Sequence, residues 1–373
     1  MSSYIGLISG TSMDGVDAAL VSFDDDAFVV HATRTAPYPN ALREQLIEAI
    51  APDARLSLHE FGSLDVAVGQ IFARAANDII AESGVDRADI TAVGSHGQTL
   101  RHSPDSAPPY TIQIGDPATI TNACRLATVA DFRSLDIAAG GQGAPLVPPF
   151  HEAYFRNANA DTVVLNIGGI ANLTFLPRDP ALPLRGFDTG PGNCLLDEWI
   201  ALHRHQAFDN DGNWARTGSI VPALLRTLMT EPYIARVPPK STGREYFNVT
   251  WLRTALQAAR ANDLRPEDVQ ATLLAYTVES VAFGIEQAAA APERVLVCGG
   301  GAHNGAIIAG LRSRLRCVSV DSIDAIGADP DSIEAVAFAW LARQRMNETP
   351  VRLTTADAVI ERLLGAVYLP SNG

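Results

Sequence analysis

Residues 4–23 read YIGLISGTSMDGVDAALVSF, in which two apolar runs lie on either side of the glycine-rich hexapeptide GTSMDG, residues 10–15. The composition of these runs predicts β-strands over 4–9 and 16–23, and a third run of the same kind covers 27–34. Because the hexapeptide is bounded by two strands, we expect it to be the turn of an antiparallel hairpin. The fold is therefore expected to begin with a β-meander.

The glycine spacing of GTSMDGVD, residues 10–17, resembles a phosphate-binding loop, but Val16 and Asp17 stand where such a loop carries lysine and a hydroxyl residue. A strand follows instead of a helix, so no helix N-terminus is available to phosphate. Backbone amides and the hydroxyls of Thr11 and Ser12 could still line a phosphate, and Asp14 could hold Mg²⁺ through water. A tight turn without a ligand remains an alternative, and Ser12 fits the GxSxG pattern of a hydrolase nucleophile poorly.

A second segment of the chain repeats this opening. Residues 162–168, TVVLNIG, and 170–176, IANLTFL, again predict two strands around a glycine turn. Strands and helices alternate after both hairpins, which predicts two α/β domains that arose by duplication. The glycine- and proline-rich stretch 134–150 is either a linker or a loop of the site. Further expected elements are helices over 41–50, 58–83, 116–123, 192–206, 218–230, 266–290, 303–315 and 332–346, and strands over 90–95, 110–115, 126–132, 293–298 and 316–320.

Composition restricts the class of protein. The chain has 373 residues, 47% of them hydrophobic, and this length suggests two domains. A net charge of −14 makes nucleic acid and anionic membranes poor partners. The apolar stretches are too short to span a membrane and no signal peptide is expected, so a cytoplasmic protein is predicted. The scattered Cys124, Cys194, Cys298 and Cys317 predict reduced, mostly buried thiols.

Two further glycine motifs are candidates for chemistry. In GFDTGPGN, residues 186–193, Asp188 is expected at the end of a strand before a helix, where it could act as a general base beside a phosphoryl acceptor or merely cap a turn. Gly190 and Gly192 predict close approach of the backbone to another group. In CGGGAHN, residues 298–304, three glycines leave room for a flat ligand, and Asn304 could bind a base or ribose.

Polar residues at other expected strand ends could hold a substrate. SHGQT, residues 95–99, and DFRSLD, residues 131–136, supply several such side chains, and Arg133 suits a substrate carboxylate. A structural role in hydrogen bonding is an equal alternative for both clusters. Glu334 follows Asp331 by three residues, which is the spacing of a helix capping box.

The order of these motifs is that of the superfamily of sugar kinases, actin and heat-shock chaperones. Five of them, GTSMDGVDAAL, SHGQT, DFRSLDIAAGGQGAPL, NIGGIANLT and GFDTGPGN, closely resemble the anhydro-N-acetylmuramic acid kinases, and the resemblance extends over about residues 5–345. It implies two actin-like (ribonuclease-H-like) α/β domains that face each other across a nucleotide-binding cleft. We expect boundaries at 1–133 and 134–346, with 347–373 joining the first domain.

The resemblance also implies an activity. Enzymes of this family use ATP, Mg²⁺ and water to open the 1,6-anhydro ring of anhydro-N-acetylmuramic acid and to phosphorylate O6, which yields N-acetylmuramate 6-phosphate for peptidoglycan recycling. Asp188 would be the base and Glu334 a second acidic group near the sugar. The sugar side would include Ser95, His96, Gln98, Asp131 and Arg133. The nucleotide side would include Gly10, Thr11, Ser12, Met13, Asp14, Gly15, Val16, Asp17, Asn166, Gly168, Gly169, Asn172, Gly190, Gly192, Gly299, Gly300, Gly301 and Asn304.

Two other functions remain to be separated from this one. A sugar kinase that phosphorylates a free hydroxyl would share the fold but not the substrate. An actin- or chaperone-like ATPase would turn over ATP without sugar, although the chain has no segment that resembles a peptide-binding domain. No nucleic acid or membrane partner is expected, and a homodimer is an open expectation.

Overall fold

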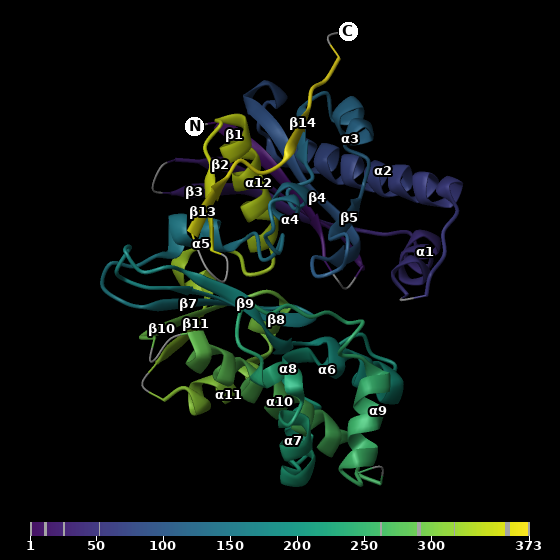
Figure 1. Ribbon diagram of the computed structural model, residues 1–373, viewed down its shortest axis with the longest axis vertical. Helices are drawn as coiled ribbons and strands as arrows, with labels where there is room; N and C mark the ends of the chain where they lie inside the picture. The colour runs from purple at the N-terminus through teal and green to yellow at the C-terminus, as the bar shows by residue number, and fades with distance from the viewer. Residues whose placement is uncertain are drawn as a thin grey trace. The chain divides into compact units, whose positions relative to one another are not determined.

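The computed structural model describes residues 2–10, 13–24, 27–51, 53–261, 263–288, 292–316, 318–354 and 359–371. Contacts between Cα atoms divide the chain into two compact units. The first unit combines Met1–Tyr154 with Ser332–Gly373, and the second is Phe155–Asp331. Figure 1 shows the elements of each unit, which are described separately below.

The described part of the first unit contains a seven-stranded mixed sheet with the order β14-β6-β4-β1-β2-β3, in which β5 pairs with β4. Strands β1, β2 and β3 form an antiparallel meander, and β4 and β6 continue from β1 in parallel. A two-stranded ladder, β12–β13, lies apart from it. The bounds are β1 Ser2–Ser9, β2 Gly15–Phe23, β3 Phe28–Pro37, β4 Ile90–Ser103, β5 Tyr110–Ile114, β6 Ala127–Ala130, β12 Val351–Thr354, β13 Val359–Arg362 and β14 Ala366–Tyr368.

Helices cover both faces of this sheet. Ile5 and Leu7 of β1 belong to the apolar core that includes α2. Gly6 of the same strand lies between them, and a Cβ atom added to it would point to the other face and meet the backbone of α12 at Ala335. Helix α2 begins with a capping box between Ser57 and Glu60. The helices of this unit are α1 Asn40–Ile50, α2 Leu58–Ser83, α3 Pro117–Cys124, α4 Ser134–Ala138, α5 Pro148–Phe155 and α12 Ile333–Met346, with a 3₁₀ turn at Arg87–Asp89.

The described part of the second unit contains a five-stranded sheet with the order β11-β10-β7-β8-β9. Its strands are β7 Thr162–Ile167, β8 Ile170–Leu176, β9 Arg185–Pro191, β10 Arg294–Cys298 and β11 Ser319–Ser322. Figure 1 shows the helices of this unit gathered on one side of the sheet. They are α6 Cys194–Arg204, α7 Pro222–Met229, α8 Pro232–Ala235, α9 Val249–Ala258, α10 Pro266–Ala288 and α11 Gly305–Arg314. Shorter 3₁₀ turns cover Asn210–Gly212, Ala215–Thr217, Gly300–His303 and Ile323–Ile326.

The two sheets share one topology. In each, an antiparallel meander (β1-β2-β3 or β7-β8-β9) is extended from its first strand by two parallel strands (β4 and β6, or β10 and β11). The resemblance between the two hairpin sequences therefore extends to the order and direction of five strands. This arrangement confirms the expected α/β fold class with two mixed sheets.

Some elements differ from those expected. The glycine-rich segment 134–150 was expected to be a linker or loop, yet it includes α4 and the start of α5, and it belongs to the first unit. Helix α12 also belongs to the first unit, because it packs on β1, β2 and β4. The contacts between Cα atoms therefore place the boundaries between the two units after Tyr154 and Asp331, whereas the expected domain boundaries followed residues 133 and 346. Strand β14 pairs with β6, so the C-terminal tail joins the first sheet.

The three cysteines that the structure describes lie inside the units, as expected. Cys124, Cys194 and Cys298 are buried, while Cys317 lies outside the described residues. Burial raises the pKa of the Cys124 thiol to about 11 and that of Cys194 to about 12. Both thiols are therefore protonated and unreactive at neutral pH.

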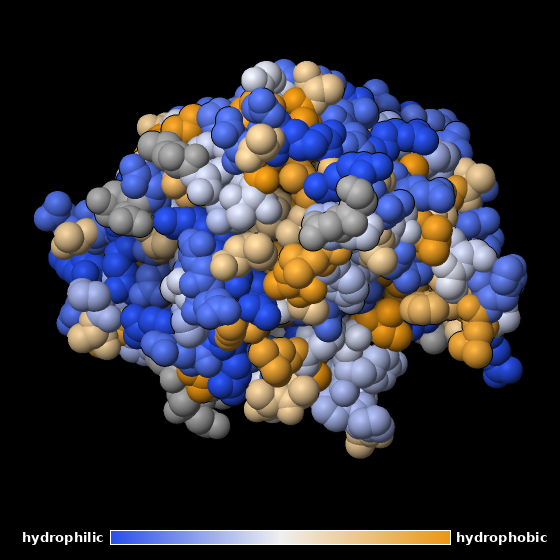
Figure 2. All heavy atoms as spheres, turned by 90° about the horizontal axis from the view of Figure 1, so that it is seen from above, coloured by the Kyte–Doolittle hydropathy of each residue, from blue (hydrophilic) through white to orange (hydrophobic). Residues whose placement is uncertain are grey.

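The face drawn in Figure 2 is mixed, with groups of apolar residues lying among hydrophilic ones. Among the described helices, none has the length and apolar character needed to cross a membrane.

Candidate functional site

The first glycine loop connects β1 to β2, as the hairpin prediction required. The carbonyl of Gly10 accepts the N–H of Met13 at 3.3 Å, and Met13 adopts a positive φ of 50°. The side chain of Asp14 is exposed. Thr11 and Ser12 lie outside the described residues, so the roles predicted for their hydroxyls stay predictions.

The base of this loop is fastened to β4. The Ser9 hydroxyl lies 2.6 Å from Oε1 of Gln98 and 2.8 Å from the carbonyl oxygen of Gly15. Gln98 Nε2 donates to the carbonyl of Gly10 at 3.4 Å. Gln98, expected on the sugar side, therefore holds the first end of the glycine loop, and Ser9 links that end to Gly15.

The strand that follows the loop carries two residues expected at the nucleotide. Val16 is fully buried in the core, so only its backbone could meet a ligand. Asp17 accepts a hydrogen bond from the Thr35 hydroxyl of the neighbouring strand at 2.6 Å. Among the described residues, no group of three or more acidic, histidine or cysteine side chains is placed to hold a metal ion.

His96 and Arg133, from different motifs, lie in contact. Nε and Nη2 of Arg133 lie 3.0 and 2.9 Å from Nε2 of His96, and Nη1 donates to the carbonyl of Gly143 at 2.6 Å. His96 Nδ1 lies 2.9 Å from the carbonyl of Gly97 and donates to it, so Nε2 is the unprotonated acceptor. Burial and the Arg133 charge hold the pKa of His96 well below its usual range. The positively charged guanidinium of Arg133 therefore joins His96 of β4 to the carbonyl of Gly143.

The other residues expected on the sugar side are dispersed. Asp131 follows β6 with a positive φ of 55°, and its Oδ1 accepts the N–H of Ser134 at 3.3 Å. Ser95 is paired with Leu7 of β1, whose side chain belongs to the core beneath α2. His96 contacts Phe338 of α12, on the opposite face. Ser95 and His96 are therefore not brought together, although they are adjacent in sequence.

Glu334 lies in the first turn of α12, but the expected capping box is absent. Ser332 is the N-cap residue, and no side-chain hydrogen bond caps this helix. Asp331, expected to be the cap, instead contacts Nε2 of His303 at 2.8 Å. The capping interpretation of Glu334 is therefore wrong, because α12 begins one residue later than its sequence suggested.

Asp188 lies within β9 and not at its end. The strand continues to Pro191, so the expected strand end is three residues later. Asp188 donates its N–H to the carbonyl of Lys240 at 3.1 Å, and its Oδ2 accepts the N–H of Thr242 at 3.0 Å. Its carbonyl accepts the hydroxyl of Tyr233 at 2.9 Å. The backbone and the carboxylate of Asp188 are thus held by a single segment of chain.

Three polar residues form a row across the second sheet. Asn166 of β7 pairs with Asn172 of β8, which in turn pairs with Asp188 of β9. Directly paired residues of antiparallel strands project from the same face. Leu165 and Phe187, each one position earlier, belong to the apolar core on the other face. The structure therefore assembles the row of Asn166, Asn172 and Asp188, which were expected separately, on the face opposite the core.

The second glycine turn packs on the start of α6. The carbonyl of Gly168 accepts the N–H of Asn193 at 2.8 Å, and that of Gly169 accepts the N–H groups of Gly192 and Cys194 at 2.9 and 3.0 Å. A Cβ atom at Gly192 would lie 2.4 Å from the Gly168 oxygen. These three amides are committed to the turn, so they do not form the anion site that a free helix N-terminus offers.

The third glycine motif has structural reasons for its composition. A Cβ at Gly299 would lie 2.2 Å from Oδ1 of Asn166, and one at Gly301 would lie 2.4 Å from Ile167. Gly300 has only one such neighbour within 4 Å and is the open position of the three. Asn304 is the N-cap residue of α11. Its Oδ1 accepts the N–H groups of Ala306 and Ile307, in the first turn of the helix, at 3.1 and 3.2 Å.

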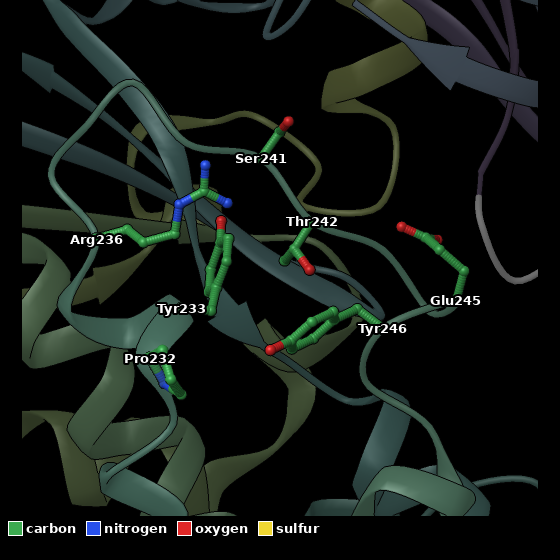
Figure 3. Close-up of a pocket in the computed structure, with 7 residues that line it drawn as sticks. All are labelled: Pro232, Tyr233, Arg236, Ser241, Thr242, Glu245 and Tyr246. Carbon is green, nitrogen blue, oxygen red and sulfur yellow. The ribbon is translucent and has the colours of Figure 1, made fainter. Parts of the chain in front are cut away.

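A pocket of about 280 Å³ is formed by the segment that holds Asp188, although Asp188 itself does not line it. It is lined by Pro232, Tyr233, Arg236, Ser241, Thr242, Glu245 and Tyr246. Two of these, Tyr233 and Thr242, donate the hydrogen bonds that hold Asp188. Figure 3 shows the Tyr233 ring between the side chains of Arg236 and Tyr246. Burial and the charge of Asp188 raise the pKa of Tyr233, which therefore remains a hydrogen-bond donor at neutral pH.

Sequence reasoning did not single out this pocket. Residues 238–245 read PPKSTGRE, and this concentration of charged, hydroxyl and glycine residues between two helices was a usable signal. What the sequence did not contain was the proximity of this segment to β9, since about fifty residues separate Thr242 from Asp188.

The family model and the relatives found by sequence name one family. The family model described as anhydro-N-acetylmuramic acid kinase matches residues 2–370. The anhydro-N-acetylmuramic acid kinase of Xanthomonas campestris pv. campestris (strain 8004) is 48% identical over 369 residues, which are 98% of this chain and 97% of that protein. The enzyme of the same name from Coxiella burnetii (strain Dugway 5J108-111) is 44% identical over 366 residues, with the same coverage. Among solved structures, the activator of 2-hydroxyisocaproyl-CoA dehydratase from Clostridium difficile with bound ADPNP has a TM-score of 0.48 at 12% identity and covers 95% of this chain and 100% of that one.

Proposed function

The chain belongs to the anhydro-N-acetylmuramic acid kinase family, and from this premise we propose which of its residues carry out the reaction. The activity is that of an ATP-using kinase of anhydro-N-acetylmuramic acid, an amino sugar of peptidoglycan recycling.

Asp188 is the proposed general base. Its carboxylate takes a proton from water as the water oxygen bonds to C1 of the sugar. The C1–O6 bond of the anhydro bridge breaks at the same carbon, and O6 bonds to the γ-phosphorus of ATP while ADP leaves. One carboxylate thus serves both the opening of an acetal and a phosphoryl transfer.

The observation that carries this assignment is the setting of Asp188. The carboxylate is oriented by the N–H of Thr242 at 3.0 Å, and Thr242 is one of the residues that line a pocket of about 280 Å³. A base must be held within reach of the proton that it removes, and a backbone amide provides a rigid hold. Figure 3 shows Thr242 among the residues that line the pocket.

Other roles follow from the family resemblance. Glu334 is the proposed second acidic group for the sugar, and the pair of His96 and Arg133 offers charge for the lactyl carboxylate. The glycine loops at 10–17, 166–172 and 298–304 are the proposed contacts of the nucleotide. The open position of Gly300 makes it the strongest candidate for close approach in the last of these.

Replacing Asp188 tests the base. We expect Asp188→Asn to lower kcat at least about 100-fold, because general-base catalysis typically contributes 10²–10⁴-fold, while ATP binding stays nearly unchanged. The exposed Asp263→Asn is the matched control and should keep full activity. Turnover by Asp188→Asn above about a hundredth of the wild-type rate would remove the base role.

Asp14 is the proposed contact of Mg²⁺ through water. Its exposed carboxylate in the first glycine loop suits a metal that is held mainly by phosphates and solvent. We expect Asp14→Asn to need a higher Mg²⁺ concentration for half-maximal activity, with little change in kcat at saturating metal. An unchanged Mg²⁺ titration would count against this role.

The substrate separates this activity from that of an ordinary sugar kinase. With anhydro-N-acetylmuramic acid, ATP and H₂¹⁸O, the product should be the 6-phosphate with ¹⁸O at C1. Phosphorylation of unbridged N-acetylmuramate at comparable efficiency would favour the alternative. We also propose a cytoplasmic location and a homodimer, and sedimentation of the purified protein tests the second of these.

A further inference from the structure

Lys240 is buried, and the three acceptors of its ammonium are uncharged. Lys240 is 6% exposed. Its Nζ donates to the carbonyl of Ile234 at 2.8 Å, to Oε1 of Gln287 at 3.1 Å and to the carbonyl of Tyr233 at 3.5 Å. It also lies 5.7 and 5.2 Å from the ring centroids of Phe187 and Tyr233. A buried ammonium costs free energy, which only well-placed acceptors and aromatic faces offset.

The same residue is bonded to Asp188 through its backbone. The Lys240 carbonyl accepts the N–H of Asp188, and two residues later the N–H of Thr242 donates to the carboxylate. Tyr233, whose carbonyl accepts from the lysine, donates its hydroxyl to the carbonyl of Asp188. The ammonium therefore joins α8, which contains residues 233 and 234, to Gln287 of α10. It joins both to residues 240–242, which orient the carboxylate.

We propose that Lys240 is a positioning residue for the catalytic base: its buried ammonium fastens residues 240–242 to α8 and α10, and thereby fixes the Thr242 N–H that orients Asp188. This inference rests on the proposed role of Asp188. The lysine acts through its neighbours and makes no contact with substrate. A hydrocarbon side chain of similar length would fill the space but would leave the segment without this anchor.

The charge of the Lys240 ammonium depends on pH in a range that can be measured. Burial and the neighbouring Arg236 lower the pKa of Lys240 to about 8, while Asp188 opposes the shift. Of the other groups that surround the ammonium, Gln287 is uncharged, and Tyr233 has a raised pKa and stays neutral. Lys240 is therefore charged at pH 7 and loses its charge within the range accessible to an enzyme assay. The interaction with Asp188 is mutual, so this charge also favours the ionised carboxylate.

The test compares pH profiles of three proteins. We expect Lys240→Met to lower kcat by about 10- to 100-fold, since a misplaced catalytic group costs rate, with KM for ATP unchanged. The acidic limb of its kcat/KM profile should move to higher pH by about half a unit or more, and the decline of the wild-type profile near pH 8 should be absent. Lys240→Arg, which keeps the charge, should restore the acidic limb.

A second variant leaves the lysine in place. Gln287→Glu puts a carboxylate beside Nζ, so the alkaline decline should move above pH 8 while kcat at pH 7 changes little. Gln287→Glu therefore tests the role of Lys240 even if Lys240→Met does not fold. An alkaline limb that stays in place would overturn the proposal, as would a Lys240→Met enzyme with wild-type kcat and pH profile.

The outcomes also separate this inference from the proposed function. If Asp188→Asn keeps its activity, the base assignment fails and this inference fails with it. If Asp188→Asn is inactive but the variants at 240 and 287 have the wild-type pH profile, only the role of Lys240 is wrong. In an Asp188→Asn background, Lys240→Met should have no further effect on kcat, because the group that it positions has been removed.

Discussion

At the scale of single residues, buried polar groups are held in one state by their neighbours. Nδ1 of His96 donates to a carbonyl, which leaves Nε2 to accept from Arg133 and keeps the ring neutral. Asp188 has its amide, carbonyl and carboxylate engaged by residues 233–242. Groups fixed in this way need little reorganisation when a substrate binds, which favours catalysis.

Buried histidines predict how stability depends on pH. Burial lowers the pKa of His151 to about 3, and burial with the Arg133 charge lowers that of His102 to about 4. Unfolded histidines titrate near 6.5, so below that pH the unfolded state binds more protons and the free energy of unfolding falls as pH falls. Each group contributes a slope of at most about 1.4 kcal/mol per pH unit down to its folded pKa.

We therefore expect the melting temperature to decrease between pH 7 and pH 5. The decrease should be smaller in His151→Gln, which removes one titrating group. The exposed His59→Gln is the control and should follow the wild type. Thermal unfolding followed by circular dichroism measures this, and equal slopes for His151→Gln and the wild type would contradict the prediction.

At the scale of elements, the contact between α12 and the first sheet depends on glycine. A Cβ at Gly94 of β4 would lie 2.2 Å from the carbonyl oxygen of Phe338, and one at Gly6 of β1 would lie 1.7 Å from that of Ala335. The helix backbone thus lies directly on two neighbouring strands. Glu334 is in the first turn of this helix, so its position depends on the same contact.

A single methyl group should disturb this packing. We expect Gly94→Ala to reduce the free energy of unfolding by about 1–3 kcal/mol or more, because overpacking a close backbone contact forces the helix away from the sheet. Gly62→Ala in α2 is the matched control, since Gly62 is exposed and has nothing near its Cβ position. That change should be neutral or stabilising by up to about 1 kcal/mol. Urea denaturation of both variants gives the comparison, and similar midpoints would refute the argument.

At the scale of the whole molecule, one unit is continuous in sequence and the other is not. The second unit lies wholly within Phe155–Asp331, whereas the first unit combines Met1–Tyr154 with Ser332–Gly373. The returning segment supplies α12 to one face of the first sheet and β14 to its edge beside β6. Without it, apolar side chains and an unpaired strand edge would be exposed.

This asymmetry predicts how fragments behave. We expect residues 155–331, expressed alone, to unfold in one cooperative transition, and residues 1–154 alone to lack one. Joining 1–154 to 332–373 through a glycine–serine linker should restore cooperative unfolding of the first unit. Cooperative melting of 1–154 by itself, followed by circular dichroism, would show that α12 and β14 are dispensable for its fold.

Local patterns were sufficient for much of the site. The hairpins around residues 10–15 and 168–169, the strand before CGGGAHN and the strand end before Asp131 follow from apolar runs and turn residues. The capping box at Glu334 was wrong, since the pattern that suggested it is compatible with more than one helix start. The pocket beside Asp188 was missed, because its residues are polar loop positions without a motif.

The sequence alone determined the class of fold, the glycine turns and the family, because apolar periodicity, turn chemistry and long specific motifs are properties of neighbouring residues. Only the tertiary structure decided that α12 belongs to the first unit, that Arg133 contacts His96 and that the Lys240 carbonyl accepts the N–H of Asp188. These facts join residues that are tens to hundreds of positions apart. Their proximity is set by how sheets and helices pack, and one chain read in order does not contain that information.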